Sequence, residues 1–130
     1  MRWLPLWLLV VTACSPKLPD GTHLLPEAET VDLRIGDQLR TERKGSNFFT
    51  FVSVLEDSRC PRGVQCIQAG RAVVEVQLLR GGTLQTETIV IDGNAIPTDR
   101  GPLQILRLEP YPDAAVDDPA PYRMVVRSAD

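Results

Sequence analysis

Apolar and polar residues alternate along most of the chain after residue 29. In residues 71–80, one face of an extended chain is apolar (Ala72, Val74, Val76 and Leu78), and the other carries Glu75 and Gln77. Strict alternation of this kind is typical of a half-buried β-strand. Alternation or enrichment in β-branched and aromatic residues predicts five further strands, at residues 30–35, 48–56, 84–92, 102–110 and 122–128.

Turn residues separate these segments. Gly81 and Gly82 stand between residues 71–80 and 84–92, and two glycines supply the positive φ angles that a tight hairpin needs. We therefore predict an all-β domain, either a small antiparallel, immunoglobulin-like β-sandwich or a barrel, with about six to seven strands. The residues expected to face inward are Val31, Leu33, Phe49, Phe51, Val74, Val76, Ile89, Ile91, Ile105 and Val126.

The first apolar run of the chain has a different character. Residues 3–11 follow Arg2 and precede Thr12, Ala13 and Cys14. This run is far shorter than the roughly 20 residues that a membrane-spanning helix needs. A positive start, a short apolar segment and small residues before a cleavage site are typical of a signal peptide. The pattern predicts an N-terminal signal helix within residues 1–13.

The sequence Val11-Thr12-Ala13-Cys14 resembles the lipobox of bacterial lipoproteins. In that family the cysteine thiol receives a diacylglyceryl group, the preceding peptide bond is cut, and the new amino terminus is acylated. The resemblance implies a mature chain, Cys14–Asp130, anchored to the membrane through Cys14. Ser15 is similar to the residue of lipoproteins sorted to the outer membrane, which implies a location facing the periplasm. The alternative is an ordinary signal peptide with Cys14 free or paired.

Residues 14–29 are expected to form a lipidated cysteine followed by a flexible tether. Residues 15–29 contain three prolines and a glycine, and proline is a poor residue for a helix or a central strand. His23 lies in this stretch and is expected to be a solvated residue. The folded domain is then expected to span residues 30–130.

Charge and histidine content narrow the range of functions. The net charge is −3 and the pI is about 5.1, which argues against a nucleic-acid partner because phosphates call for a basic face. The single histidine argues against a metal site, and we predict neither a metal nor another cofactor. The acidic residues Asp113, Asp117 and Asp118 lack the ligand spacing of an EF-hand, so a solvated acidic loop is expected.

Cys60 and Cys66 lie close together in the sequence, and Cys14 is remote from both. A structural disulfide between Cys60 and Cys66 is the simplest interpretation, and closing such a loop stabilises a fold by about 2.4 kcal/mol. We expect it to brace a loop that crosses from one sheet to the other. A metal site and a redox-active pair are the alternatives, although neither a nearby histidine or third cysteine nor a C-x-x-C spacing is present.

The stretch around these cysteines is similar to a pattern, D-S-R-C-P-x-x-V-x-C-x-x-A-G, found in small, largely uncharacterised bacterial lipoproteins and exported proteins. The residues that match it are Asp57, Ser58, Arg59, Cys60, Pro61, Val64, Cys66, Ala69 and Gly70. The resemblance implies a secreted β-domain and carries no biochemical activity.

The candidate recognition residues lie in or beside this loop: Asp57, Arg59, Arg62 and Arg71. Loops carry function more often than strands, but salt bridges within the loop are the alternative. Tyr111 and Tyr122 flank the proline-rich residues 110–122 and are expected to pin that loop through a hydroxyl hydrogen bond.

Three hypotheses for the function follow. The first is a non-enzymatic lipoprotein whose β-domain binds or supports another envelope component. The second is an inhibitor or a small-ligand-binding module that uses the Cys60–Cys66 loop and residues 110–122. The third is an enzyme, which we do not predict because adjacent strand residues such as Asp57 and Ser58 point to opposite faces and do not form a catalytic pair.

Overall fold

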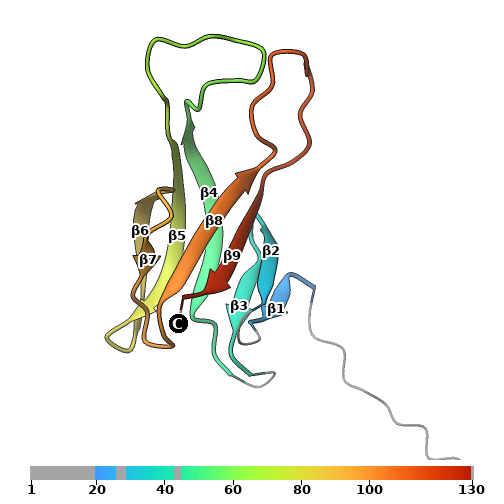
Figure 1. Ribbon diagram of the computed structural model, residues 1–130. Helices are drawn as coiled ribbons and strands as arrows, with labels where there is room; N and C mark the ends of the chain where they lie inside the picture. Colours follow the sequence, from blue (N-terminus) through green and yellow to red (C-terminus); the bar gives the residue numbers. More distant parts are fainter. Residues whose placement is uncertain (1–19, 26–28, 43–44, 130) are drawn as a thin grey trace, which may run out of the picture.

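The computed structural model describes residues 20–25, 29–42 and 45–129, and these form two β-sheets packed face to face (Figure 1). Nine strands and no helix occur in the described residues. That part of the chain accordingly has no helix that is long and apolar enough to cross a membrane. The predicted all-β sandwich is confirmed, and the expected signal helix and Cys14 lie outside the described residues.

The two sheets contain five and four strands. Sheet A has the order β1-β3-β4-β5-β6, and its strands are β1 (Thr22–Leu24), β3 (Gln38–Arg40), β4 (Phe49–Asp57), β5 (Ala72–Arg80) and β6 (Thr83–Val90). Sheet B has the order β2-β9-β8-β7, and its strands are β2 (Thr30–Arg34), β9 (Arg123–Ser128), β8 (Leu103–Glu109) and β7 (Ala95–Ile96). Neighbouring strands are antiparallel except β1 and β3, which are parallel.

The six predicted strands correspond to β2, β4, β5, β6, β8 and β9. The sequence did not predict β1, β3 and β7, which have two or three residues each and are too short to show an alternating pattern.

Strand β1 falls inside the segment expected to be a tether, so that expectation is wrong for residues 22–24. The strand pairs with β3, and main-chain hydrogen bonds extend the pairing at both ends: Gln38 donates to Gly21 (2.7 Å) and Leu25 donates to Arg40 (3.1 Å). The His23 side chain is not merely solvated, because its Nε2 lies 2.9 Å from Oδ2 of Asp37. These partners are contributed by a distant strand, which composition does not reveal.

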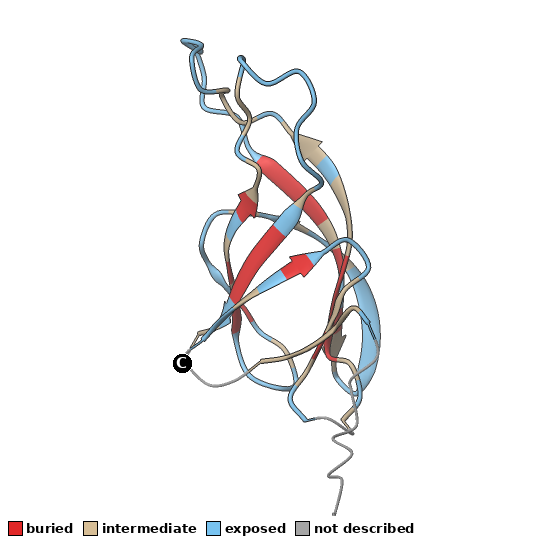
Figure 2. Cartoon of the chain, turned by 90° about the vertical axis from the view of Figure 1, so that its right-hand side faces the viewer, coloured by how far each residue is buried: buried red, intermediate tan, exposed pale blue. Residues whose placement is uncertain are grey.

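The core lies between the sheets, in the middle of the molecule (Figure 2). Seven of the ten residues expected to face inward are buried, namely Leu33, Phe49, Phe51, Val74, Val76, Ile105 and Val126. The other three, Val31, Ile89 and Ile91, are partly buried and pack against the core. Removal of this apolar surface from water is the main favourable contribution to the fold.

The predicted hairpin joins β5 and β6. Gly81 and Gly82 have φ angles of 62° and 78°, a left-handed conformation that glycine adopts without a Cβ clash. The Asp99 carboxylate accepts hydrogen bonds from both glycine N–H groups, at 2.8 and 2.6 Å. The turn is therefore fixed by glycine conformation and by a side chain from the β7–β8 connection.

Strand β4 places Asp57 between the sheets. Two irregularities interrupt its pairing with β5, the first between Phe51 and Ser53 and the second between Val54 and Glu56. Each extra residue of a bulge reverses the alternation of side chains, so two of them restore it. Asp57 then lies opposite the buried Ala72, on the inner face and at the end of the strand.

Candidate functional site

Two long loops extend from the same end of the sandwich, residues 58–71 after β4 and residues 110–122 after β8 (Figure 1). Main-chain hydrogen bonds join them: Arg62 donates to the carbonyl of Pro112 (2.9 Å), and Ala114 donates to the carbonyl of Arg62 (3.1 Å). The first loop connects neighbouring strands of sheet A, so the expectation that it crosses between sheets is wrong. We refer to the two loops together as the loop end.

The first loop is closed by a disulfide. Cys60 and Cys66 are bonded to each other, with their Cα atoms 5.9 Å apart, as the first of the three interpretations predicted. The loop tip is exposed: Ile67 is fully exposed and Val64 is half exposed. The covalent ring of residues 60–66 therefore presents Val64 at the surface, and Ile67 is exposed directly after the ring.

Gly70 allows the base of this loop to close. A Cβ atom at this position would lie 1.5 Å from the Ser58 carbonyl oxygen. The close approach permits hydrogen bonds from the Ser58 N–H to the Arg71 carbonyl (2.9 Å) and from the Arg71 N–H to Oγ of Ser58 (3.1 Å). Glycine is needed here for its small size, not for an unusual φ angle.

Asp57 and Arg59 form a part-buried ion pair joined by two hydrogen bonds. Nε and Nη2 of Arg59 donate to the two carboxylate oxygens of Asp57, each at 2.7 Å. The guanidinium also donates to the carbonyls of Leu108 (2.7 Å) and Pro110 (3.1 Å), and the hydroxyl of Tyr122 donates to Asp57 (3.0 Å). Since Leu108 lies in β8 of sheet B and Tyr122 immediately precedes β9, the pair ties the two sheets together at the loop end.

This network shifts three ionisation equilibria. Burial of the Asp57 carboxylate opposes its ionisation, but hydrogen bonds from Arg59 and Tyr122 outweigh burial and hold the pKa of Asp57 below its ordinary value. The hydrogen bond to Asp57 raises the pKa of Arg59. Burial, followed by the hydrogen bond to Asp57, raises the pKa of Tyr122. The pair is therefore ionised, and Tyr122 is neutral, at neutral pH.

Tyr111 lies beneath two guanidinium groups. Arg59 and Arg62 stand 4.8 and 5.3 Å from the centroid of its ring, within the range of a cation–π interaction. Among the described residues, the Arg59 guanidinium donates four hydrogen bonds, whereas the Arg62 side chain makes none and is exposed. Arg62 therefore contributes to the surface of the loop end.

Arg71, the fourth residue predicted for the site, lies at the surface and pairs with Glu56. Its guanidinium contacts the Glu56 carboxylate at 3.1 Å, and both side chains are largely exposed. Ser58 donates its hydroxyl hydrogen to the same carboxylate (2.9 Å), and hydrogen bonds from Arg71, then from Ser58, lower the pKa of Glu56. The sequence analysis missed Glu56, although the register of two neighbouring strands would place it beside Arg71.

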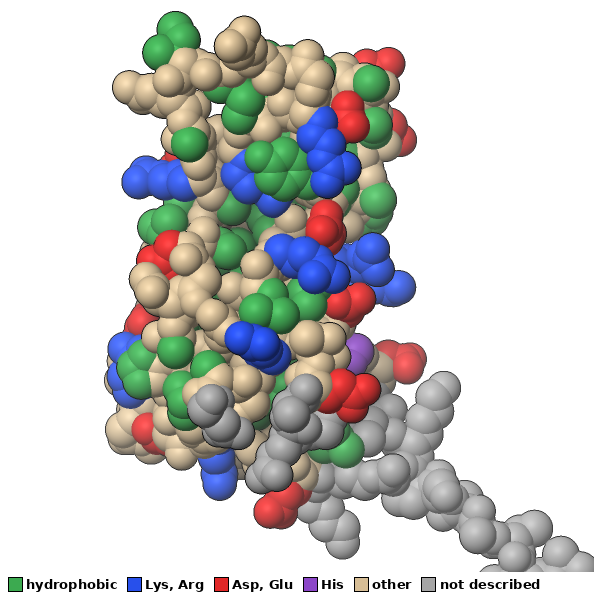
Figure 3. Space-filling view, in the orientation of Figure 1, with side chains coloured by type: hydrophobic (Ala, Val, Ile, Leu, Met, Phe, Trp, Pro, Cys, Tyr) green, Lys and Arg blue, Asp and Glu red, His purple; other side chains and the backbone are tan. Residues whose placement is uncertain are grey.

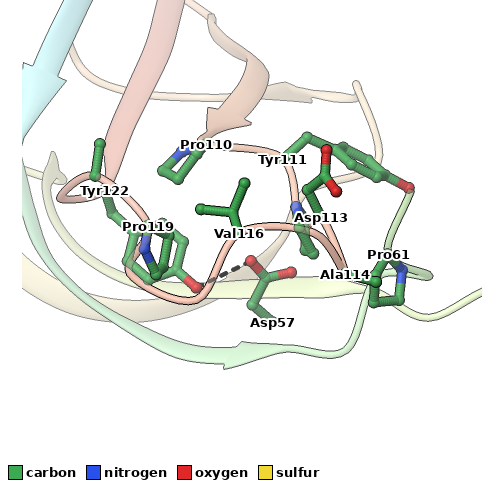
Figure 4. Close-up of a pocket in the computed structure, with 11 residues that line it drawn as sticks. Asp57, Pro61, Pro110, Tyr111, Asp113, Ala114, Val116, Pro119 and Tyr122 are labelled. Atoms are coloured by element: carbon green, nitrogen blue, oxygen red, sulfur yellow. Dashed lines mark hydrogen bonds between the residues drawn. The ribbon is translucent and has the colours of Figure 1, made fainter. Parts of the chain in front are cut away.

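A cavity of about 300 Å³ lies between the two loops. Figure 4 shows the Val116 side chain pointing into it, with Tyr111 and Tyr122 on opposite sides and the Tyr122–Asp57 hydrogen bond at one wall. The lining is mainly proline, tyrosine and small apolar residues, with two carboxylates: Asp57, Pro61, Pro110, Tyr111, Pro112, Asp113, Ala114, Val116, Pro119, Ala120 and Tyr122. Of the predicted recognition residues, only Asp57 lines the cavity.

Other features of the described surface are less specific. The face seen in Figure 3 carries basic and acidic side chains intermixed. Residues 20–25, 29–42 and 45–129 contain no group of three or more His, Cys, Asp or Glu residues that could hold a metal ion. A second hollow at the loop end, lined by Glu56, Ser58, Gln68, Ala69, Gly70 and Arg71, is more open and more polar than the cavity.

Comparison with protein-family models, with curated proteins and with solved structures gives no match. The described residues form a β-sandwich with a disulfide in one loop and a cavity between two loops at one end.

Proposed function

We propose that this chain is a lipid-anchored protein of the bacterial cell envelope, and that its β-sandwich binds another envelope component through the loop end. The proposed anchor is Cys14, on the resemblance of residues 11–14 to a lipobox, and Ser15 favours the outer membrane with the domain facing the periplasm. The observation that carries the binding function is the cavity between the disulfide loop and the proline-rich loop.

The position of the cavity suits an anchored binding module. Strand β1, the first element of the described chain, lies in the half of the sandwich away from the loop end (Figure 1). Five residues lie between Cys14 and Asp20, and the six residue-to-residue steps of an extended chain span at most about 21 Å. An anchor at Cys14 would hold the domain near the lipid, with the loop end directed away from it.

The bonding at the loop end favours binding over catalysis. The Asp57 carboxylate is engaged by Arg59 and Tyr122, and the Ser58 hydroxyl donates to Glu56. A nucleophile needs a base placed to remove its proton, but the carboxylate beside Ser58 is itself paired with Arg71. These groups serve to fix the shape of the loops, and fixed loops lose little entropy on binding.

Photo-crosslinking in intact cells tests the binding function. A photoreactive amino acid replaces Ile67, which is fully exposed in the first loop (residues 58–71), in the full-length protein. The matched control places it at Ile35, which is half exposed and lies in the turn after β2, outside the loop end. We expect a discrete crosslinked product from position 67 that disappears when Val116→Trp fills the cavity. Equal products from positions 67 and 35, or none from 67, would overturn the proposal.

A separate experiment tests the anchor. Cys14→Ser removes the acceptor for the lipid, so we expect loss of radiolabelled fatty acid from the protein and its release from washed membranes. Cys60→Ser with Cys66→Ser is the control, since it removes the other two cysteines and should leave membrane attachment unchanged. Membrane retention of the Cys14→Ser protein would contradict the proposed anchor.

The second candidate function, a small-ligand-binding module, draws on the same cavity. Its volume of about 300 Å³ lies at the lower limit of the roughly 300–1,000 Å³ typical of small-molecule sites. A thermal stabilisation of the protein by a small-molecule extract of the envelope, lost in Val116→Trp, would favour this alternative over a macromolecular partner.

A further inference from the structure

The cavity at the loop end has a lining that restricts what it can bind, and the inference drawn from it rests on the proposed binding function. Proline and tyrosine rings form most of its surface. Rigid, ring-lined grooves of this kind bind extended segments that carry proline or aromatic side chains, because flat apolar surfaces stack with little loss of conformational entropy. The small volume accommodates one or two such side chains at a time.

The walls of the cavity are held in place before any ligand binds. The Arg62 main chain is hydrogen-bonded to Pro112 and Ala114 on the facing loop, and Tyr122 is bonded to Asp57 on the end of β4. Cys60 is fixed by its disulfide, next to the wall residue Pro61. Preformed walls avoid an ordering cost when a partner binds, so the shape of the cavity selects its ligand.

The charged groups around the cavity are mainly acidic. Asp113 is half-buried in the wall, and Asp117 and Asp118 are exposed on the same loop. None of these three carboxylates forms a salt bridge with a described residue. Arg59 and Arg62 lie against the Tyr111 ring but do not line the cavity.

We infer that the occupant of the cavity is an extended segment of a partner protein in which a proline or an aromatic residue stands beside a lysine or an arginine. The ring enters the space around Val116, between Tyr111 and Tyr122. The basic side chain reaches the carboxylates of Asp113, Asp117 and Asp118 at the rim. The apolar contact supplies most of the affinity, and the rim charges supply selectivity and the rate of association.

Selection from a displayed library of random short peptides tests this inference, with the full-length lipidated protein held in detergent micelles. We expect enrichment of sequences that place lysine or arginine next to proline, tyrosine, tryptophan or phenylalanine. Synthetic copies of the enriched peptides are then titrated against the protein at low and high salt. Binding should weaken as salt rises, because exposed charges are screened.

Two variants and a control decide the outcome. Asp113→Asn/Asp117→Asn/Asp118→Asn should weaken binding at least about tenfold at low salt and remove most of the salt dependence. Val116→Trp should abolish binding at any salt concentration. The control, Asp20→Asn/Asp32→Asn/Glu75→Gln, removes the same number of charges outside the loop end and should bind as the wild type does. Circular dichroism and thermal unfolding confirm that each variant is folded.

The results separate this inference from the proposed function. Failure to enrich any peptide, or enrichment of peptides without a basic residue and insensitive to the triple Asn variant, would overturn the inference. If position 67 still gave a specific crosslink under those circumstances, the binding function would stand with a different class of ligand. Absence of that crosslink would overturn both.

Discussion

The guanidinium of Arg59 and the carboxylate of Asp57 meet in two parallel hydrogen bonds of 2.7 Å each, at the end of the sandwich where β4 leaves sheet A. Only 14% of the Arg59 side chain and 7% of the Asp57 side chain are exposed. The same guanidinium reaches two carbonyls at the end of β8, in sheet B. One side chain therefore links both sheets and fixes the start of the second loop.

Removal of Arg59 should be strongly destabilising. Arg59→Ala leaves the buried Asp57 carboxylate without its counter-ion, and we expect the free energy of unfolding to fall by about 3 kcal/mol or more. The matched control is Arg71→Ala, which breaks the exposed pair with Glu56 and should cost less than about 1 kcal/mol. Urea unfolding at neutral pH measures both. Equal losses in the two variants would show that burial of the Asp57–Arg59 pair has no energetic consequence.

The hydrogen bonds to Asp57 should make the free energy of unfolding depend on pH. The pKa of Asp57 is lower in the folded protein than its ordinary value, so ionised Asp57 stabilises the fold above about pH 4. This contribution is lost as the pH falls through the lowered pKa. Asp57→Asn should therefore be less stable than the wild type at pH 7, and the difference should shrink as the pH falls below about 4. A difference that stays constant over this range, measured by urea unfolding, would contradict the assignment.

Gly70 should not tolerate a side chain. The added methyl group of Gly70→Ala would overlap the carbonyl of Ser58, and the loop base would have to open at a cost of about 1–3 kcal/mol. The control is Gly63→Asn, because no atom lies within 4 Å of a Cβ at Gly63 and asparagine accepts its positive φ angle. Thermal unfolding of both variants checks the prediction, which an unchanged midpoint for Gly70→Ala would contradict.

The disulfide should contribute to stability through the unfolded chain. Replacing Cys60 and Cys66 together by serine is expected to lower the free energy of unfolding by about 2.4 kcal/mol, because the loop between them is no longer closed in the unfolded state. The control is a reducing agent, which should destabilise the wild type by a similar amount and leave the double-serine variant unchanged. If the reductant also destabilised the variant, the effect would not come from this bond.

The sequence was sufficient to predict the long strands but not the ends of the domain. Segments such as residues 71–80 alternate regularly, and alternation directly reports one buried face. Strands β1, β3 and β7 depend on main-chain partners from elsewhere in the chain, and three residues carry no period. The prolines around Thr22–Leu24 favoured a tether, although Gly21 and Leu25, on either side of this strand, form main-chain hydrogen bonds with Gln38 and Arg40.

The site was predictable only in part for a related reason. Cys60 and Cys66 are near one another in sequence, so their pairing could be proposed from spacing alone. Tyr122 was expected to pin its loop, and its hydroxyl does bond to Asp57. The cavity, however, is made by two loops about fifty residues apart, and both loops follow strands, β4 and β8, whose pairing is interrupted by register shifts. Local pattern does not contain that information.

The weak attachment of β1 to β3 affects how far the N-terminal segment can extend from the domain. No residue of β1 is fully buried, and the strand is held at the edge of sheet A by three residue pairs, by short flanking hydrogen bonds and by the His23–Asp37 contact. Elements with so few buried contacts open at a small fraction of the global unfolding cost. Releasing residues 20–29 would leave every strand of the core paired and would add up to about 35 Å of extended chain. Tension along the N-terminal segment would therefore lengthen the connection to the domain before it disturbed the loop end.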